Sequence, residues 1–450
     1  MEPFRHHVFV CTQQKPEAVG SCPNSGSLPV LQALEREIAS QRLDNEVQLT
    51  TCGCLGLCDD GPMLIIYPEG SWYHKVKVED VREIVDSHLR SGTVVSRLEW
   101  SDAQAMQATS VEHRERYRAM VKARDVGGIL PEELNEMIRA FMPSRVVLTA
   151  LELDLFTAVA SGASAAQVAQ KIHADTRATE MLLNALSSLK LLEKREETFF
   201  NTPESARFFE EGSPDNARNG LIHTAHIWHR WSTLTDCVRA GTLVETGRRE
   251  GSWVPAFIAA MDRNAKERTA AVVKAAGGPG IKRMLDLGGG SAAYSIAFVQ
   301  ATPGLQSVIL DLAEVVPLAQ ENIRKAGLAE RIITRAGDML RDPLGENYDL
   351  ILGSAICHMF SPEENRRLFR RAFDALAAGG RLVVQDFILE PSKTAPRAAA
   401  LFSLNMLVGT RAGSSYSGPE YTSWLRDAGF ADVRRVRLPG PAGLMIGTRE

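Results

Sequence analysis

Residues 285–293 read LDLGGGSAA, an apolar run that ends in three glycines followed by small side chains. The pattern predicts a buried strand, a tight turn and the start of a helix. Glycine lets the backbone turn sharply and approach a bound ligand closely. Gly288, Gly290 and Ala293 also fit a dinucleotide-binding fingerprint. The motif alone therefore leaves open a dinucleotide, an adenosyl ligand or a glycine turn that binds nothing.

This stretch begins an alternation of apolar runs and helical segments. The later runs are SVILDL (307–312), RIITRAGD (331–338), YDLILGSAI (348–356) and RLVVQDFIL (381–389). Such an alternation predicts a doubly wound, Rossmann-like parallel sheet, here assigned to residues 256–450. Ser361, Pro362 and Glu364 predict the start of one helix, and Gly379 predicts its end.

Two acidic positions narrow the choice of ligand. Asp311 ends the second apolar run, about twenty residues after the glycines, where a carboxylate accepts both ribose hydroxyls. Asp338 and Met339 follow the third run, as Gly-Asp-Met. NAD-binding domains share the glycine turn and the first acid, whereas the third feature favours S-adenosylmethionine.

His358 and Asp386 are the candidate catalytic pair. His358 follows the fourth apolar run and Asp386 lies in the fifth, and in a doubly wound sheet both strand ends face the ligand crevice. Methyl transfer to an oxygen requires alignment of two atoms and removal of a proton, which histidine does near neutral pH. The competing interpretation is that His358 caps a helix and Asp386 is an ordinary strand-end acid.

The region 128–255 is predicted to be mostly helical and to contain a winged helix. Residues 163–203 give helix, turn and helix, followed by a hairpin around 195–197. The candidate recognition helix carries few positive charges, which favours subunit packing over DNA reading. Farther on, His223, His226 and His229 lie at helical spacing, but no carboxylate or cysteine completes a metal site, so we expect pocket lining or core packing.

Five of the seven cysteines lie within the first 58 residues, and residues 50–62 read TTCGCLGLCDDGP. Clustered cysteines without a secretory signal indicate metal or redox chemistry. Four thiolates on two loops suit zinc or an iron–sulfur cluster, although the tight C-x-x-C spacing of structural zinc is absent. The surrounding pattern predicts a compact α/β domain at 1–92, followed by a charged, partly helical linker at 93–127.

The net charge of −4 gives no basic face for nucleic acid, and no apolar run is long enough to span a bilayer. We therefore expect a cytoplasmic protein that binds neither nucleic acid nor a membrane. A redox-sensing winged-helix regulator is a further hypothesis, which a gel-shift assay with genomic DNA tests.

With CLGLCDDGP and IIYPEGSWYHKV, residues 5–92 resemble the thioredoxin-like 2Fe-2S ferredoxins. The resemblance implies a 2Fe-2S cluster with Cys11, Cys22, Cys54 and Cys58 as ligands and Cys52 as a spare thiol nearby. It also makes an external electron donor a possible partner.

From about residue 130 onwards, the chain resembles the caffeate and acetylserotonin type of O-methyltransferase. The motifs are LDLGGG, the LDL around Asp311, GDM, AICHMFSPEENRRL and GGRLVVQDFIL. The resemblance implies a homodimer, S-adenosylmethionine at the strand ends and a small-molecule acceptor. It implies these roles: cofactor binding by Asp286, Gly288, Gly290, Asp311, Asp338 and Met339, with His358 as the base beside Asp386.

The chain departs from this family at three places. Met359 and Phe360 replace the usual Asp-Trp after the histidine, Asp386 replaces a glutamate, and Ser415 aligns with the family's second glutamate. We therefore expect a methyltransferase that acts on a phenolic, enolic or quinol-type hydroxyl, with electron delivery or redox control by the cluster. The alternative is a redox enzyme of the same fold that binds S-adenosylmethionine without transferring its methyl group.

Overall fold

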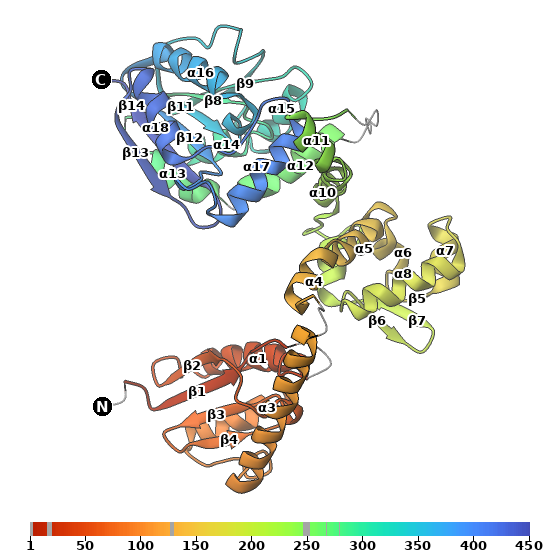
Figure 1. Ribbon diagram of the computed structural model, residues 1–450. Helices are drawn as coiled ribbons and strands as arrows, with labels where there is room; N and C mark the ends of the chain where they lie inside the picture. The colour runs from red at the N-terminus through yellow and green to blue at the C-terminus, as the bar shows by residue number, and fades with distance from the viewer. Residues whose placement is uncertain (1–2, 16–19, 127–129, 246–252, 267, 279) are drawn as a thin grey trace. The chain divides into compact units, whose positions relative to one another are not determined.

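The computed structural model describes residues 3–15, 20–126, 130–245, 253–266, 268–278 and 280–450. The chain separates into two compact units, Met1–Ala140 and Phe141–Glu450, which are described one at a time (Figure 1). Among the described residues, no helix is long and apolar enough to cross a membrane.

The first unit contains a four-stranded sheet in the order β2-β1-β3-β4. The strands are β1 (His6–Cys11), β2 (Val47–Cys52), β3 (Leu64–Tyr67) and β4 (Ser71–Tyr73). β1 pairs in parallel with β2 and antiparallel with β3. Helix α1 (Ser27–Ser40) buries Val30, Leu34 and Ile38, one stripe at helical spacing, against Val8 and Val10 of β1. The helical segments α2 (Val81–Glu83) and η4 (Ile84–Arg90) complete this core.

Two more helices belong to this unit, α3 (Ala103–Val126) and α4 (Glu132–Arg139). α3 occupies most of the segment predicted as a linker. Among the side chains of α3 that the structure describes, one is fully buried, and it is the polar His113, at 1 % exposure. The segment therefore packs against the first unit rather than extending freely from it.

The second unit starts with a helical region that contains the predicted hairpin. Its helices are α5 (Phe141–Glu152), α6 (Leu155–Val159), α7 (Ala165–Lys171), α8 (Thr176–Ser188) and α9 (Pro203–Phe209). The strands β5 (Ala163–Ser164), β6 (Leu192–Arg195) and β7 (Thr198–Asn201) form a small sheet in the order β5-β7-β6. Three helices lead on to the last domain, α10 (Arg218–Trp231), α11 (Leu234–Ala240) and α12 (Trp253–Lys266).

The last domain is built on a seven-stranded sheet in the order β10-β9-β8-β11-β12-β14-β13. The strands are β8 (Arg283–Leu287), β9 (Gln306–Asp311), β10 (Ile332–Ala336), β11 (Tyr348–Ser354), β12 (Leu376–Asp386), β13 (Ala431–Arg437) and β14 (Gly443–Thr448). The first five are parallel, as predicted, whereas β14 runs antiparallel to β12 and to β13. This antiparallel edge was not predicted.

Helices cover both faces of this sheet. One face packs α13 (Thr269–Ala276), α14 (Ala293–Ala301) and α15 (Val316–Lys325), and the other packs α16 (Pro362–Ala375) and α18 (Gly418–Asp427). α17 (Arg397–Gly409) lies between β12 and α18 in sequence. α16 starts at the predicted cap, with the Ser361 and Glu364 side chains bonded reciprocally to backbone amides. Its predicted end at Gly379 is wrong, because the helix stops at Ala375 and β12 begins at once.

Candidate active site and cysteine centre

The glycine turn joins β8 to α14. Gly288 and Gly290 have positive φ angles of 67° and 54°, a region that disfavours residues with a side chain. A Cβ atom on Gly288 would lie 2.6 Å from Ile356 Cδ1 and 3.4 Å from Met339 Cε. The turn therefore favours glycine at these positions, and Met339 lies beside it.

Asp311 ends β9, the strand next to β8, and its side chain reaches the glycine turn. Its carboxylate accepts hydrogen bonds from the Gly290 amide at 2.8 Å and from the Leu312 amide at 2.7 Å. Burial raises the pKa of Asp311, although both amide bonds oppose the shift. A buried acid held at a strand end, next to a glycine turn, is suited to receive the hydroxyls of a ribose.

Asp286 lies near the end of β8, and its carboxylate is more deeply buried than that of Asp311. Its carboxylate is 1 % exposed and accepts a bond from the Ser295 hydroxyl at 2.7 Å, while Oδ1 is buried without a hydrogen-bond partner. Burial raises its pKa to about 7, despite the bond from Ser295. A Cβ atom on Gly289 would lie 3.0 Å from this carboxylate. Asp286 therefore packs beneath the turn and supports it from below.

Asp338 follows β10 and is half-buried. Its Oδ1 accepts a bond from the Leu340 amide at 2.8 Å, and its own amide donates to Asp342 Oδ2 at 2.7 Å. These bonds fix the turn after β10, which carries Met339 towards Gly288.

His358 lies in the short helical turn η5 (Cys357–Met359) after β11, and Asp386 is the last residue of β12. His358 Nδ1 lies 2.6 Å from Asp386 Oδ1, and both side chains are buried. The carboxylate acts as an acceptor, so Nδ1 carries a proton, and in the neutral imidazole Nε2 then has the lone pair. The structure thus brings together the two residues predicted as the catalytic pair.

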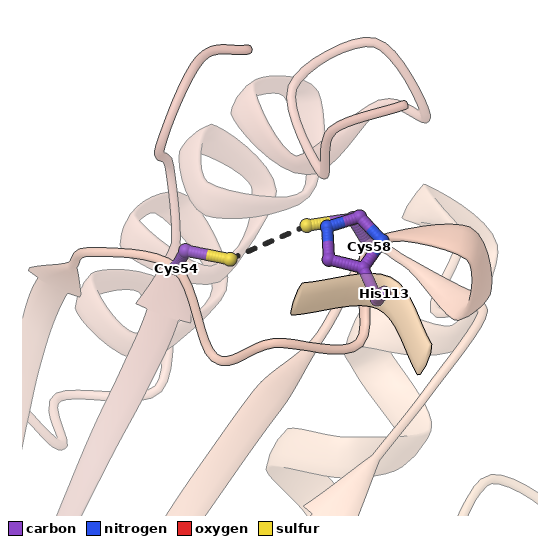
Figure 2. A group of neighbouring side chains, drawn as sticks. All are labelled: Cys54, Cys58 and His113. Atoms are coloured by element: carbon purple, nitrogen blue, oxygen red, sulfur yellow. Dashed lines mark hydrogen bonds between the residues drawn. The ribbon is translucent and has the colours of Figure 1, made fainter. Parts of the chain in front are cut away.

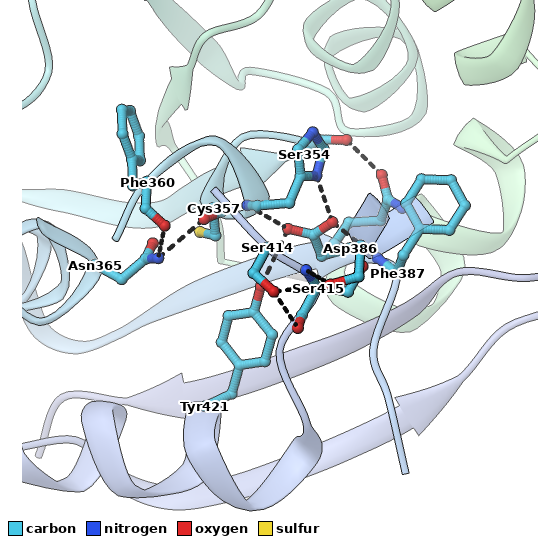
Figure 3. A network of polar contacts seen from close by, with 12 residues as sticks. Ser354, Cys357, Phe360, Asn365, Asp386, Phe387, Ser414, Ser415 and Tyr421 are labelled. Carbon is cyan, nitrogen blue, oxygen red and sulfur yellow. Dashed lines mark hydrogen bonds and ion pairs between the residues drawn. The ribbon is translucent and has the colours of Figure 1, made fainter. Parts of the chain in front are cut away.

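Asp386 is held by further donors. Its carboxylate accepts bonds from the backbone amides of His358 at 3.1 Å and Phe387 at 2.8 Å, and from the Tyr421 hydroxyl at 3.1 Å. Figure 3 shows this network, which joins β12, η5 and α18. Tyr421 was not found from the sequence, because its contact with Asp386 spans 35 residues. Four donors on one carboxylate fix the imidazole in one orientation.

Ser415, at the place of the family's second glutamate, is 3 % exposed. Its amide donates to Ser403 Oγ at 3.3 Å, and its own hydroxyl is buried without a hydrogen-bond partner. The neighbouring Ser414, labelled with Ser415 in Figure 3, donates its backbone amide to the carbonyl of His358 at 2.9 Å. Asp386 is therefore the one carboxylate that hydrogen-bonds His358 among the described residues.

Aromatic rings surround the histidine. Phe387 and Phe402 stack with centroids 4.1 Å apart, and the Phe402 ring meets His358 edge to face at 4.8 Å.

On α10, His223 is buried against Phe257, and burial lowers its pKa to about 4. The position of His223 fits the predicted core packing.

Cys11 and Cys52 are the last residues of β1 and β2, and Cys22, Cys54 and Cys58 lie in the segments that follow these strands. Cys11, Cys22 and Cys58 are buried and Cys54 is exposed. Cys54 Sγ lies 3.3 Å from Cys58 Sγ, as Figure 2 shows. This separation is too long for a disulfide of about 2.0 Å. It approaches the sulfur–sulfur distance of about 3.8 Å for two thiolates on one tetrahedral metal with bonds of about 2.3 Å.

The thiols form two pairs. A hydrogen bond from Cys22 lowers the pKa of Cys11 to about 6, and one from Cys58 lowers the pKa of Cys54 to about 5, against the effect of burial in both cases. The other member of each pair has a raised pKa, because it donates that bond. Cys52, which pairs with Cys11 across β1 and β2, has a pKa raised to about 11 by burial. Four thiols in two pairs match the donor set of a 2Fe-2S cluster, and Cys52 belongs to neither pair.

Family comparisons agree with this geometry. An O-methyltransferase domain profile matches residues 238–431, and an O-methyltransferase dimerisation domain profile matches residues 135–211. The 3-hydroxy-5-methyl-1-naphthoate 3-O-methyltransferase of Streptomyces sahachiroi is 34 % identical over 334 residues, which cover 71 % of this chain and 95 % of that protein. The chain belongs to the O-methyltransferase family.

Other relatives of this methyltransferase support the assignment. The bovine acetylserotonin O-methyltransferase is 30 % identical over 338 residues, or 68 % of this chain and 94 % of that protein. The crystal structure of human N-acetylserotonin methyltransferase with SAM aligns with a TM-score of 0.63 at 27 % identity, over 71 % of this chain and 97 % of that one.

The first unit has relatives of its own. A profile of the thioredoxin-like [2Fe-2S] ferredoxins matches residues 2–89. The 2Fe-2S ferredoxin of Clostridium pasteurianum is 40 % identical over 97 residues, which cover 21 % of this chain and 95 % of that protein. The two family memberships confirm the predicted enzyme class and both predicted cofactors, S-adenosylmethionine and a 2Fe-2S cluster.

Proposed function

We propose that this methyltransferase methylates a hydroxyl group of a small aromatic acceptor, with His358 as general base. The observation that carries the proposal is the 2.6 Å contact between His358 Nδ1 and Asp386, because it leaves Nε2 free to take a proton. Bound S-adenosylmethionine supplies an electrophilic methyl group. His358 removes the proton of the attacking hydroxyl, and Asp386 orients the ring and stabilises the imidazolium that forms.

The cofactor contacts are part of the proposal. Gly288 and Gly290 let the backbone approach the ligand, and Asp311 accepts the ribose hydroxyls. Asp338 and Met339 bind on the adenine side. Asp286, the sixth predicted cofactor residue, supports the turn from beneath through Ser295 rather than by exposing its carboxylate.

The aromatic surroundings support a flat acceptor. The rings of Phe387 and Phe402 stack beside His358 and make its surroundings aromatic, and aromatic side chains favour edge-to-face or offset contacts with another ring. The relatives named above act on naphthoate and acetylserotonin, both of which are aromatic. We therefore place phenols and hydroquinones ahead of aliphatic enols as acceptors.

A homodimer is also proposed. The dimerisation profile matches residues 135–211, and at the start of α5 two large apolar side chains within it, Phe141 and Met142, are 52 % and 50 % exposed. Large apolar side chains exposed together on a surface indicate a protein interface. The mass measured in solution should be that of a dimer, and Phe141→Glu should shift it towards the monomer. A monomeric wild-type chain contradicts this proposal.

For the 2Fe-2S cluster we propose electron delivery to the acceptor before methylation. A quinone takes two electrons and two protons to become a hydroquinone, and only the hydroquinone offers a hydroxyl to be methylated. Cys11, Cys22, Cys54 and Cys58 would hold the cluster, which would supply electrons from an external donor one at a time, so each acceptor would need two transfers. Fusion in one chain raises the local concentration of one module at the other. A redox switch on activity is the competing role.

The experiment that tests the basic activity supplies the full chain with S-adenosylmethionine and a panel of phenols, hydroquinones and aliphatic enols. Mass spectrometry should detect methyl ethers and S-adenosylhomocysteine in equal amounts, with aromatic acceptors preferred. Oxidised or hydroxylated products without S-adenosylhomocysteine would instead support the redox enzyme that does not transfer the methyl group.

A further inference from the structure

α3 lies outside the region that matches the ferredoxin family, which ends at residue 89, yet it packs on the cysteine loops. Met106 packs against the apolar cluster that contains Cys11 and Cys22. One turn farther on, Ser110 Oγ approaches Gly56 so closely that a Cβ atom there would lie 2.5 Å away. Gly56 lies between Cys54 and Cys58, so α3 rests on the loop that carries these two thiols.

The contacts continue along one face of the helix. Lys15, from the loop between Cys11 and Cys22, places its ammonium 4.9 Å from the centre of the Tyr117 ring. The residues that face the loops, 106, 110, 113 and 117, are spaced by four, three and four, which is one face of an α-helix. α3 is thus docked by a continuous stripe rather than by a single contact.

His113 stands at the centre of this stripe. One of its ring nitrogens lies within 4.8 Å of the sulfur atoms of Cys54 and Cys58, and Figure 2 shows the three side chains facing one another. Its Nε2 lies 2.9 Å from Lys15 Nζ, and its Nδ1 lies 3.3 Å from an Arg116 nitrogen. His113, which lies beyond the ferredoxin match, therefore places a buried imidazole next to Cys54 and Cys58.

These groups lie where they favour a bound anion. Arg116 pairs with Asp59, whose carboxylate also lies 3.9 Å from His113 Nδ1. The Lys15 ammonium donates to His113 Nε2 and is a hydrogen-bond partner of Cys54. Lysine carries a positive charge at neutral pH, so a cation lies beside the thiols.

A 2Fe-2S cluster with four thiolate ligands is such an anion. Two ferric ions, two sulfides and four thiolates sum to two negative charges, and one added electron makes three. Cations and hydrogen-bond donors next to the sulfurs favour the more negative, reduced form, and so raise the reduction potential.

We propose that Lys15 and Arg116, bridged by His113, form a cationic cap on the Cys54–Cys58 side of the cluster, and that α3 raises the reduction potential of the cluster through it. Lys15 donates hydrogen bonds towards the sulfurs, and His113 accepts one from Lys15 and so holds the ammonium in place. Arg116 holds the helix in place through Asp59. The proposal assumes that the four cysteines bind the cluster, and it assigns no ligand role to His113.

The test is a redox titration of the anaerobically purified full chain, followed by visible absorption and electron paramagnetic resonance. Lys15→Met and His113→Leu should keep iron and sulfide at wild-type levels. Each should lower the ratio of reduced to oxidised cluster about tenfold at a fixed potential, which corresponds to about 59 mV for one electron. His113→Gln retains an acceptor for the Lys15 ammonium and should recover part of the shift.

Two matched controls separate charge from position. Lys77 is an exposed lysine of the same unit that pairs with Glu79, and Arg114 is an exposed arginine of α3. Lys77→Met and Arg114→Met remove the same charge from exposed positions and should leave the potential unchanged. Wild-type potentials in both Lys15→Met and His113→Leu would overturn the cap. Loss of iron in His113→Leu and in His113→Gln would also overturn it, because His113 would then be a ligand.

Discussion

His358 and Cys54 each lie a few residues beyond the end of a strand, but their surroundings differ. His358 is buried and bonded to Asp386, which accepts three further hydrogen bonds. Cys54 is exposed, and its nearest polar neighbours are Cys58, Lys15 and His113. The candidate base is therefore held by a hydrogen-bond network of the chain's own groups, whereas the cysteine centre places four thiols and a lysine ammonium where a cluster would bind.

This contrast suggests why the two sites respond differently to substitution. In a completed network, loss of one residue changes a rate but leaves the fold in place. In a centre assembled around a cluster, loss of one ligand removes the cluster itself, because metal binding is coupled to local folding. The predictions below start from the largest expected effect.

The largest effect is expected for a cluster ligand. Cys22→Ser should lose nearly all iron and acid-labile sulfide, because Cys11 remains without its partner thiol and the cluster has lost one of its four proposed ligands. Cys52→Ser is the matched control and should retain both, because Cys52 belongs to neither thiol pair. Metal analysis of anaerobically purified protein measures this difference. Zinc in place of iron in the wild type, or loss of iron in Cys52→Ser alone, would contradict the ligand set.

His358→Ala should lower turnover by about 100-fold to 10,000-fold and leave the affinity for S-adenosylmethionine nearly unchanged, because general base catalysis acts on the chemical step. Asp386→Asn should cause a smaller loss, since the base remains but loses its charged partner. His173→Asn, at an exposed histidine of the same unit, is the control. Normal turnover in His358→Ala would show that the completed network is structural and not catalytic.

Asp311→Ala should weaken binding of S-adenosylmethionine by more than tenfold. The charge-assisted contact with the ribose is worth about 1.5 to 3 kcal/mol. Glu314→Gln changes an exposed acid three residues away and should have no effect. Calorimetry on the two variants gives the answer, and equal affinities, or a preference for NAD, would remove Asp311 from the cofactor site.

The smallest effect concerns Asp286, whose pKa burial raises to about 7. Between about pH 4 and 7 the folded carboxyl keeps its proton while the unfolded one has lost it, so this group lowers stability as pH rises, and the decline stops above pH 7. Asp286→Asn should remove that slope. The melting temperature of the wild type relative to the variant, without cofactor, should fall by a few degrees from pH 5 to pH 8. A difference that is constant with pH would show that Asp286 does not titrate in this range.

Much of the methyl-transfer domain could be predicted because its signals are local. The run 285–293 contains a strand, a turn and a helix start, and Ser361 with Glu364 marks a helix start within four residues. The end of α16 was not predictable in this way. Glycine often ends a helix, which is why Gly379 was predicted, but β12 begins before it, where Leu376 pairs with Tyr348.

The parts that were missed depend on contacts between distant residues. Tyr421 binds Asp386 across 35 positions, and Phe387 meets Phe402 through the fold rather than through a sequence pattern. His113 had a weak local signal, the spacing of Met106, Ser110, His113 and Tyr117. Its polarity concealed the stripe, because helix faces are recognised from apolar side chains.

The central claim is that the two sites serve one reaction, with the cluster reducing an acceptor that His358 then helps to methylate. The most direct test offers the full chain a quinone, S-adenosylmethionine, NADPH and a ferredoxin reductase under anaerobic conditions, with reactions lacking the chain as the baseline. The account predicts a methyl ether from the quinone with the wild type but not with Cys22→Ser, while both methylate the pre-reduced hydroquinone at the same rate. Equal rates for the two proteins with both forms of the acceptor would contradict it.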